Sequence, residues 1–193
     1  MAQIGVERAG DADVVAQITR RAFDRRNGEE VEMIARIRAA PKFILALPKF
    51  ILALSLVAEV GGRPVGHLLI SRDKLRLEGG QPTDQEGLML GPISVLPDAQ
   101  RRGVGSRLMR RGLDTAASRP ELVVVLIGHP EYYPRFGFRP AREFGLHPDW
   151  DAAMVYPLWP DLSAYRELHL PEQSVCRCNA WRKPLQADHS QPL

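Results

Sequence analysis

The sequence contains little cysteine, few aromatic residues and no strong excess of one charge. Its 193 residues include 2 cysteines, and Cys176 and Cys178 are separated by a single residue. This pair gives no disulfide framework, matches no standard zinc pattern, and favours a reducing compartment without a metal site. A net charge of +3 is too small by itself to indicate a nucleic-acid-binding protein. Hydrophobic and charged fractions of 45% and 25% are ordinary for a folded globular chain.

Long apolar runs and a secretion signal are missing as well. The most apolar segment, residues 43–60, is interrupted by Pro48 and Lys49, whereas a membrane-spanning helix needs about 20 apolar residues. The first residues show no basic stretch followed by an apolar one, which excludes a signal peptide. We therefore expect a cytoplasmic protein that does not bind membranes.

One short repeat lies in this apolar segment. Residues 41–47 and 48–54 are identical, and each copy begins with proline. Because proline interrupts both helices and strands, no single element is expected to run through both copies. The repeat is either a local duplication or an apolar flap added over a site.

Hydrophobic periodicity predicts an α/β fold with a mixed sheet. Helices are expected after an N-cap at Asp11, after a capping box formed by Asn27 and Glu30, and over residues 103–118. Strands are expected at residues 4–8, 56–60, 64–75, 88–96, 122–127, 138–140 and 153–156, with a Gly61-Gly62 hairpin turn, a loop at 78–86 and a short helix at 131–136. We predict one domain over residues 1–157, followed by a partly disordered extension, 158–193, with one further strand at 175–181.

A glycine-containing stretch connects the strand at residues 88–96 to the helix at 103–118. Gly103 and Gly105 allow the backbone to approach a ligand closely, and the helix start offers N–H groups and partial positive charge. Arg101 and Arg102 add hydrogen-bond donors suited to phosphate. A P-loop is excluded because no Gly-Lys-Ser/Thr follows, and the dinucleotide fingerprint is excluded because its third glycine is absent.

Two motifs together resemble those of a known family. Gln100-Arg-Arg-Gly103-Val-Gly105 resembles the Gln/Arg-x-x-Gly-x-Gly/Ala signature of the GNAT superfamily of N-acetyltransferases. Tyr133-Pro-Arg-Phe-Gly137-Phe138 resembles the family's Tyr-x-x-x-Gly-Phe motif, one helix and one strand downstream. The longer string at residues 128–138 is similar to a bacterial branch often called YhbS-like. The resemblance covers roughly residues 3–157 and includes neither the repeat nor the C-terminal extension.

The resemblance implies a GNAT acyltransferase fold, a mixed central sheet flanked by helices, with acetyl-CoA as co-substrate. It also implies direct transfer of the acetyl group to a primary amine, with a small molecule favoured over a protein. Strand backbone groups would bind the pantetheine arm, loop amides would bind the pyrophosphate, and Tyr133 would lie at the thioester sulfur. The implied cofactor-binding residues are Ile93, Ser94, Val95, Gln100, Arg101, Arg102, Gly103, Val104, Gly105 and Ser106.

The base that deprotonates the amine is left open. Many family members carry a glutamate on the strand before the signature, but residues 88–92 contain no carboxylate. His129, directly after the strand at 122–127, is the candidate catalytic base, with His67 and Glu131 as alternatives, or water acting on an amine of low pKa. His67 also fits a satisfied core histidine, and Tyr132 fits a packing role.

Two other classes of function stay open. An acyl-CoA-binding module or sensor without transferase activity would fit the missing strand carboxylate and the apolar repeat. The abundance of arginine suggests nucleic-acid binding, although we expect no nucleic-acid partner. Pairing of two chains through the C-terminal extension leaves a homodimer open.

Overall fold

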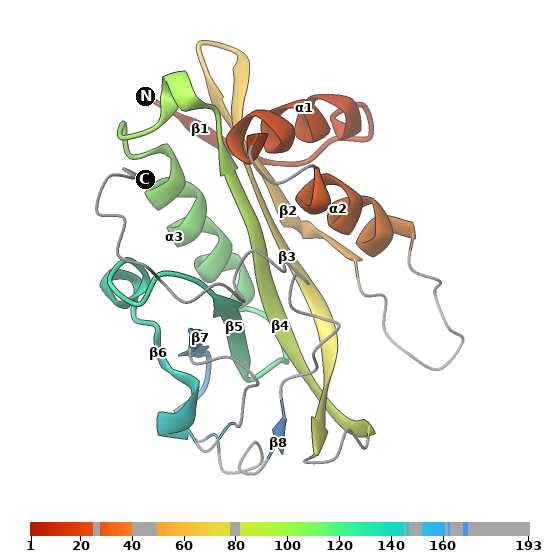
Figure 1. The fold of residues 1–193 in the computed structure, drawn as a ribbon, viewed down its shortest axis with the longest axis vertical. Coiled ribbons are helices and arrows are strands. Elements are labelled where there is room, and N and C mark those ends of the chain that lie inside the picture. The colour runs from red at the N-terminus through yellow and green to blue at the C-terminus, as the bar shows by residue number, and fades with distance from the viewer. Residues whose placement is uncertain are drawn as a thin grey trace.

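The computed structural model describes residues 1–24, 28–39, 50–77, 82–144, 146, 152–160, 162 and 168–169 (Figure 1). Its elements, in chain order, are β1 (Gln3–Val6), α1 (Ala12–Ala22), α2 (Glu29–Ala39), β2 (Phe50–Val60), β3 (Arg63–Leu77), β4 (Pro82–Val95), η2 (Pro97–Ala99), α3 (Val104–Ala116), β5 (Val123–Ile127), η3 (Tyr133–Phe136), β6 (Arg139–Pro140), η4 (Ala141–Phe144), β7 (Ala153–Pro157) and β8 (Leu168–His169).

The strands form one mixed sheet, as the sequence predicts. Its order is β1-β2-β3-β4-β5-β7-β6, and β8 pairs with β3. β4 and β5 are parallel, and the other pairs are antiparallel. The parallel pair is joined through α3, which is the helical crossover that parallel neighbours require.

Helices cover both faces of the sheet, because alternate strand residues point to opposite faces. α3 packs on one face, and α1 and α2 pack on the other (Figure 1). The α3 face contributes Leu56, Leu68, Ile70, Leu108, Met109 and Leu113 to the largest core cluster. The opposite face forms a smaller cluster of Val15, Ile34, Ile37, Val57 and Leu69.

The predicted hairpin between β2 and β3 is confirmed. Gly61 and Gly62 adopt φ values of +58° and +77°, and Val60 pairs with Arg63. Positive φ at both central residues is the requirement of a type I′ turn, which glycine meets without a steric cost.

One local prediction is wrong, and one N-cap differs in detail. Residues 82–86 belong to β4 rather than to a loop; within this stretch Glu86 pairs across to Lys74 of β3 and forms an ion pair with buried Arg72 at 3.2 Å. Asp11 is the N-cap residue of α1, as predicted, but its side chain does not bond the helix; its Oδ2 instead accepts a hydrogen bond from the Arg8 amide at 2.8 Å.

Part of the C-terminal extension packs against the domain. Leu162 is buried in a cluster with Val123 and Val125, and Leu168–His169 pairs with β3. The boundary at residue 157 stays a prediction. Asn27, the first repeat copy, the possible strand at 175–181 and the cysteine pair lie outside the described residues. Among the helices in the described ranges, none has the length and apolarity needed to cross a membrane.

Candidate active site

One edge of β4 is left open where β4 and β5 separate. β4 pairs with β5 only at Leu88 and Met89 within the described residues, and it continues past the end of β5 (Figure 1). Leu68 pairs with Ile93 and Ile70 pairs with Leu90, so β4 holds one extra residue between these two pairs. A bulge of this kind turns the strand and is common beside active sites.

The backbone groups of Ile93 and Val95 face this open edge. The Leu96 amide donates to the Val65 carbonyl at 2.8 Å, which shows that the even-numbered residues here bond to β3. Groups of alternate residues in an antiparallel strand point in opposite directions. Ile93 and Val95 therefore present peptide groups to the side away from β3, as the sequence-based assignment requires. The peptide groups of Ser94 instead face β3. The buried Ser94 hydroxyl donates a hydrogen bond to Thr19 Oγ1 of α1 at 3.2 Å.

The open edge leads directly into the start of α3. Arg101 and Gly103 both have left-handed backbones, with φ values of +58° and +76°. The first helical hydrogen bond runs from the Arg107 amide to the Gly103 carbonyl at 3.1 Å. The amides of Val104, Gly105 and Ser106 precede it and are the donors that a helix start leaves for an anion.

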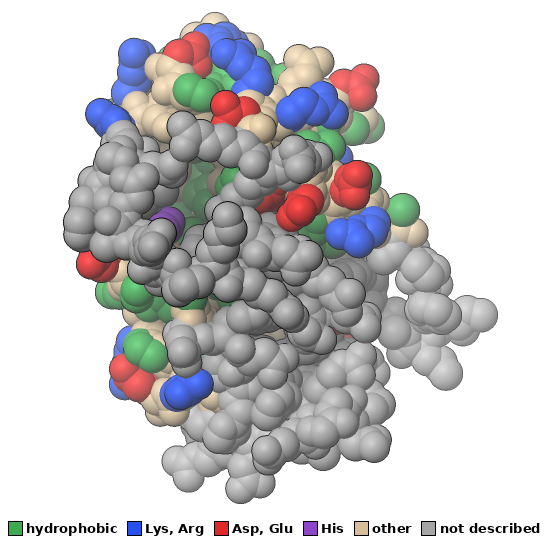
Figure 2. All heavy atoms as spheres, viewed as in Figure 1, with side chains coloured by type: hydrophobic (Ala, Val, Ile, Leu, Met, Phe, Trp, Pro, Cys, Tyr) green, Lys and Arg blue, Asp and Glu red, His purple; other side chains and the backbone are tan. Residues whose placement is uncertain are grey.

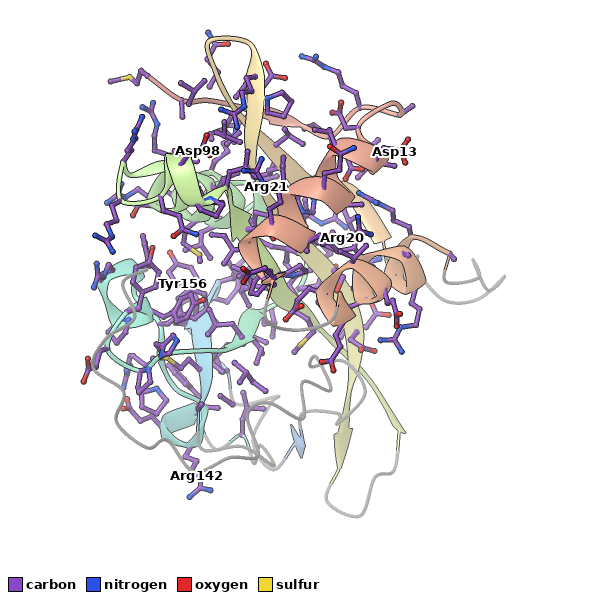
Figure 3. The ribbon with its side chains drawn as sticks, turned by 45° about the horizontal axis from the view of Figure 1, so that its top comes forward. Asp13, Arg20, Arg21, Asp98, Arg142 and Tyr156 are labelled. Carbon is purple, nitrogen blue, oxygen red and sulfur yellow. The ribbon has the colours of Figure 1, made fainter. Side chains whose placement is uncertain are left out.

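Two side-chain contacts hold this loop. Gln100 Nε2 donates to the Val95 carbonyl at 3.0 Å, which ties the loop to the end of β4. Arg63 of the β2–β3 hairpin bonds Asp98 of η2 at 3.0 Å, and this hydrogen bond lowers the pKa of Asp98. Figure 3 shows Asp98 close to Arg21 of α1, which adds to the same effect. The Gln100 side chain therefore bonds the backbone of its own loop and helps to fix the loop conformation.

Two exposed arginines lie in the loop. Arg101 and Arg102 are exposed, and neither forms an ion pair with any residue that the structure describes. Figure 2 shows Lys and Arg side chains, with some Asp and Glu side chains among them, at the end of the molecule where η2 and the start of α3 lie. The charges of the two loop arginines complement an anionic ligand at the helix start.

Tyr133 lies at the carboxyl end of β5. A Cβ atom on Gly128 would come within 2.1 Å of Tyr133 Cε2, so the ring rests directly on this glycine. Phe138 packs against the ring with centroids 6.0 Å apart. Burial raises the pKa of the Tyr133 phenol to about 12, and the neighbouring Tyr132 adds to this shift. The phenol is therefore a hydrogen-bond donor throughout the neutral pH range.

The three candidate bases lie in different surroundings. His129 and Glu131 are exposed in the turn before η3, where the His129 carbonyl accepts a hydrogen bond from the Tyr132 amide at 3.0 Å. His67 is fully buried in β3. His129 and Glu131 thus lie in the exposed turn that leads to Tyr133, whereas His67 lies between the sheet and the helices that cover it.

His67 belongs to a buried polar network beneath α2. Its Nε2 lies 3.0 Å from Ser55 Oγ and 3.6 Å from Glu7 Oε2. Ser55 and Arg38 both donate to the Glu7 carboxylate. Burial lowers the pKa of His67, which keeps the ring neutral. No local sequence pattern joins these four residues, because they come from separate elements.

The comparison with protein families decides the classification. The model for the acetyltransferase (GNAT) domain matches residues 7–141 of this chain. The chain belongs to the GNAT acetyltransferase family. The matched range includes β4, the loop, α3 and Tyr133, so the resemblance based on two short motifs is confirmed over most of the chain.

Individual relatives agree with this GNAT assignment. The chain is 34% identical to the uncharacterized N-acetyltransferase YjhQ of Escherichia coli over 130 residues, which are 67% of this chain and 65% of that protein. A GNAT family acetyltransferase from Brucella melitensis, solved in complex with acetyl-CoA, is 32% identical with a TM-score of 0.64 and covers 84% and 91% of the two chains. YhbS from E. coli, solved with CoA, shares the fold at 24% identity and a TM-score of 0.71, over 89% and 90% of the chains.

Proposed function

We propose that this GNAT protein is an acetyl-CoA-dependent N-acetyltransferase that acetylates a primary amine. The observation that carries the proposal is the continuous path from the open β4 edge to the start of α3, with Tyr133 across from it at the end of β5. The acetyl-CoA complex of the Brucella relative supports the identity of the acetyl donor. A reducing cytoplasm is the compartment that the cysteine content favours.

The cofactor arm would bind along β4 as an added strand does. Ile93 and Val95 offer peptide groups to the amides of pantetheine. The amides of Val104, Gly105 and Ser106 would hold the pyrophosphate, because the helix start concentrates donors and partial positive charge there. Arg101 and Arg102 would add long-range attraction for the phosphates.

Tyr133 would stabilise the leaving thiolate by donating a hydrogen bond. A thiol has an ordinary pKa of about 8.5, whereas the pKa of Tyr133 is about 12. Because the thiol is the stronger acid, the phenol keeps its proton and acts through electrostatic stabilisation. Full protonation of the sulfur is left to solvent after the acetyl group has moved.

The transfer itself is a direct attack. The lone pair of the neutral amine forms the new C–N bond at the thioester carbonyl, and the C–S bond breaks as the electron pair moves to sulfur. The proton released from nitrogen would go to His129, whose exposed ring lies in the turn that leads to Tyr133. The acceptor we propose is an amine on a small molecule.

The test compares Tyr133→Phe with the matched control Tyr156→Phe. Tyr156 lies on β7, behind Phe138, with ring centroids 5.6 Å apart (labelled in Figure 3). Thiol release from acetyl-CoA would be followed with a panel of monoamines, polyamines, amino-acid amides and lysine peptides. Tyr133→Phe should lower kcat by about 100-fold with unchanged affinity for acetyl-CoA, and Tyr156→Phe should behave like the wild type.

Two results would contradict the proposal in different ways. Equal turnover of wild type and Tyr133→Phe would exclude a catalytic role for that phenol. Binding of acetyl-CoA without acetylation of any amine in the panel would favour a binding module or sensor over an enzyme.

A further inference from the structure

The side chain of Tyr132 reaches the start of α3. A Cβ atom on Gly105 would lie 3.7 Å from Val95 Cγ2, 3.9 Å from Ile93 Cδ1 and 3.9 Å from Tyr132 Oη. The Tyr132 hydroxyl therefore lies beside the second residue of α3 and close to the open edge of β4. Tyr132 itself is the residue that precedes η3.

The Tyr132 ring is held in place by its own neighbours. Tyr133 packs edge-on against it with centroids 5.1 Å apart, and Phe136 does so at 5.5 Å. The Arg135 guanidinium lies over the ring, 4.5 Å from its centroid. Contacts of this kind fix the ring and thereby the direction of its hydroxyl.

The hydroxyl itself has no role in this packing. Within the described residues, Tyr132 Oη makes no hydrogen bond, and its contacts are made by the ring. A phenylalanine would fill the same space. A half-buried phenol usually finds a partner for its O–H, and this hydroxyl lies near Gly105 at the start of α3.

We propose that Tyr132 is a cofactor-binding residue, which rests on the proposed function. Its hydroxyl donates a hydrogen bond to the pyrophosphate of acetyl-CoA where this group passes Gly105. The phosphate oxygens are thus bound from two sides, by the α3 amides and by Tyr132. Arg135, stacked on the ring, adds positive charge on the same side. The two adjacent tyrosines then have different roles: Tyr132 binds the pyrophosphate, and Tyr133 stabilises the charge on the sulfur.

The test removes the hydroxyl and keeps the ring. Tyr132→Phe should weaken acetyl-CoA binding in calorimetry about three- to tenfold, the range of one hydrogen bond. Its KM for acetyl-CoA should rise while kcat is unchanged, in contrast to Tyr133→Phe, which should lower kcat. Tyr156→Phe removes a phenol hydroxyl from the same aromatic cluster and should bind as the wild type does.

S-acetylpantetheine, which lacks the pyrophosphate, distinguishes a contact of the Tyr132 hydroxyl with pyrophosphate from a contact with the pantetheine arm. Tyr132→Phe should bind this fragment as the wild type does if the hydroxyl contacts phosphate. A loss with both ligands would overturn the pyrophosphate assignment. Unchanged affinity of Tyr132→Phe for acetyl-CoA, with wild type binding normally, would overturn the cofactor role of Tyr132. Failure of the folded wild type to bind acetyl-CoA would refute the proposed function itself.

Discussion

Acidification should remove a large stabilising contribution of the Glu7 carboxylate. The Glu7 side chain is 6% exposed and accepts hydrogen bonds from Ser55 and Arg38. Burial alone would raise its pKa, but the polar contacts with His67, Arg38 and Ser55 outweigh burial and lower the pKa from 4.5 to about 2. A difference of this size corresponds to about 3 kcal/mol in the free energy of unfolding.

The sign of the pH dependence follows from the lowered pKa. Between pH 4.5 and 2, the unfolded chain binds a proton at Glu7 that the folded chain does not bind. The contribution is therefore complete above pH 4.5 and is lost as the pH falls toward 2. Urea unfolding of wild type and Glu7→Gln should show a stability gap that is widest near pH 7 and narrows by about 3 kcal/mol at pH 2.

Glu59→Gln is the matched control. Glu59 forms a more exposed pair with Arg8 at 3.7 Å, and pairs of this kind contribute about 1 kcal/mol or less. Its stability gap should stay small at every pH. A gap between wild type and Glu7→Gln that does not change between pH 7 and pH 2 would refute the account of the buried network.

Two further substitutions test packing around the site. Gly128→Ala should displace the ring of Tyr133 and lower kcat by about 100-fold. The control Gly10→Ala, which has open space around it, should have no effect on kcat. A fully active Gly128→Ala enzyme would contradict the catalytic placement of the Tyr133 ring. Glu121→Ala removes one of the two carboxylates that Arg72 contacts, at 2.5 Å, and leaves Glu86 as the other; it should lower the free energy of unfolding by about 2 kcal/mol. Glu143→Ala breaks the exposed ion pair between Glu143 and Arg139 and should cost less than about 1 kcal/mol. Equal urea midpoints for these two variants would contradict the importance of burial.

The elements with strong local patterns could be predicted from the sequence. The valine-rich strand, the amphipathic helix α3 and the Gly61-Gly62 turn each carry their signal within a few residues. The glycine-containing turn between β4 and α3 could also be predicted, because Gly103 starts the helix with a left-handed backbone that glycine adopts readily. These features also set the order of the elements and hence the mixed sheet.

The longer-range features could not be predicted. Residues 82–86 look like a polar loop because what makes them a strand, their backbone pairing with β3, comes from another element. The network around Glu7 likewise joins β2, β3 and α2 to the chain after β1. Tyr132 has no local pattern that separates a packing aromatic from one whose hydroxyl reaches Gly105.

The most direct test of the central claim is a calorimetric titration with acetyl-CoA, with AMP as the control ligand. We expect wild type to bind acetyl-CoA in the micromolar range or tighter and AMP far more weakly. Gly105→Asp, which places a negative charge among the helix-start amides, should abolish binding, and the uncharged Gly105→Ala should retain it because a Cβ fits there at 3.7 Å or more from its neighbours. Absence of binding by folded wild type, or retained affinity in Gly105→Asp, would contradict the placement of the cofactor.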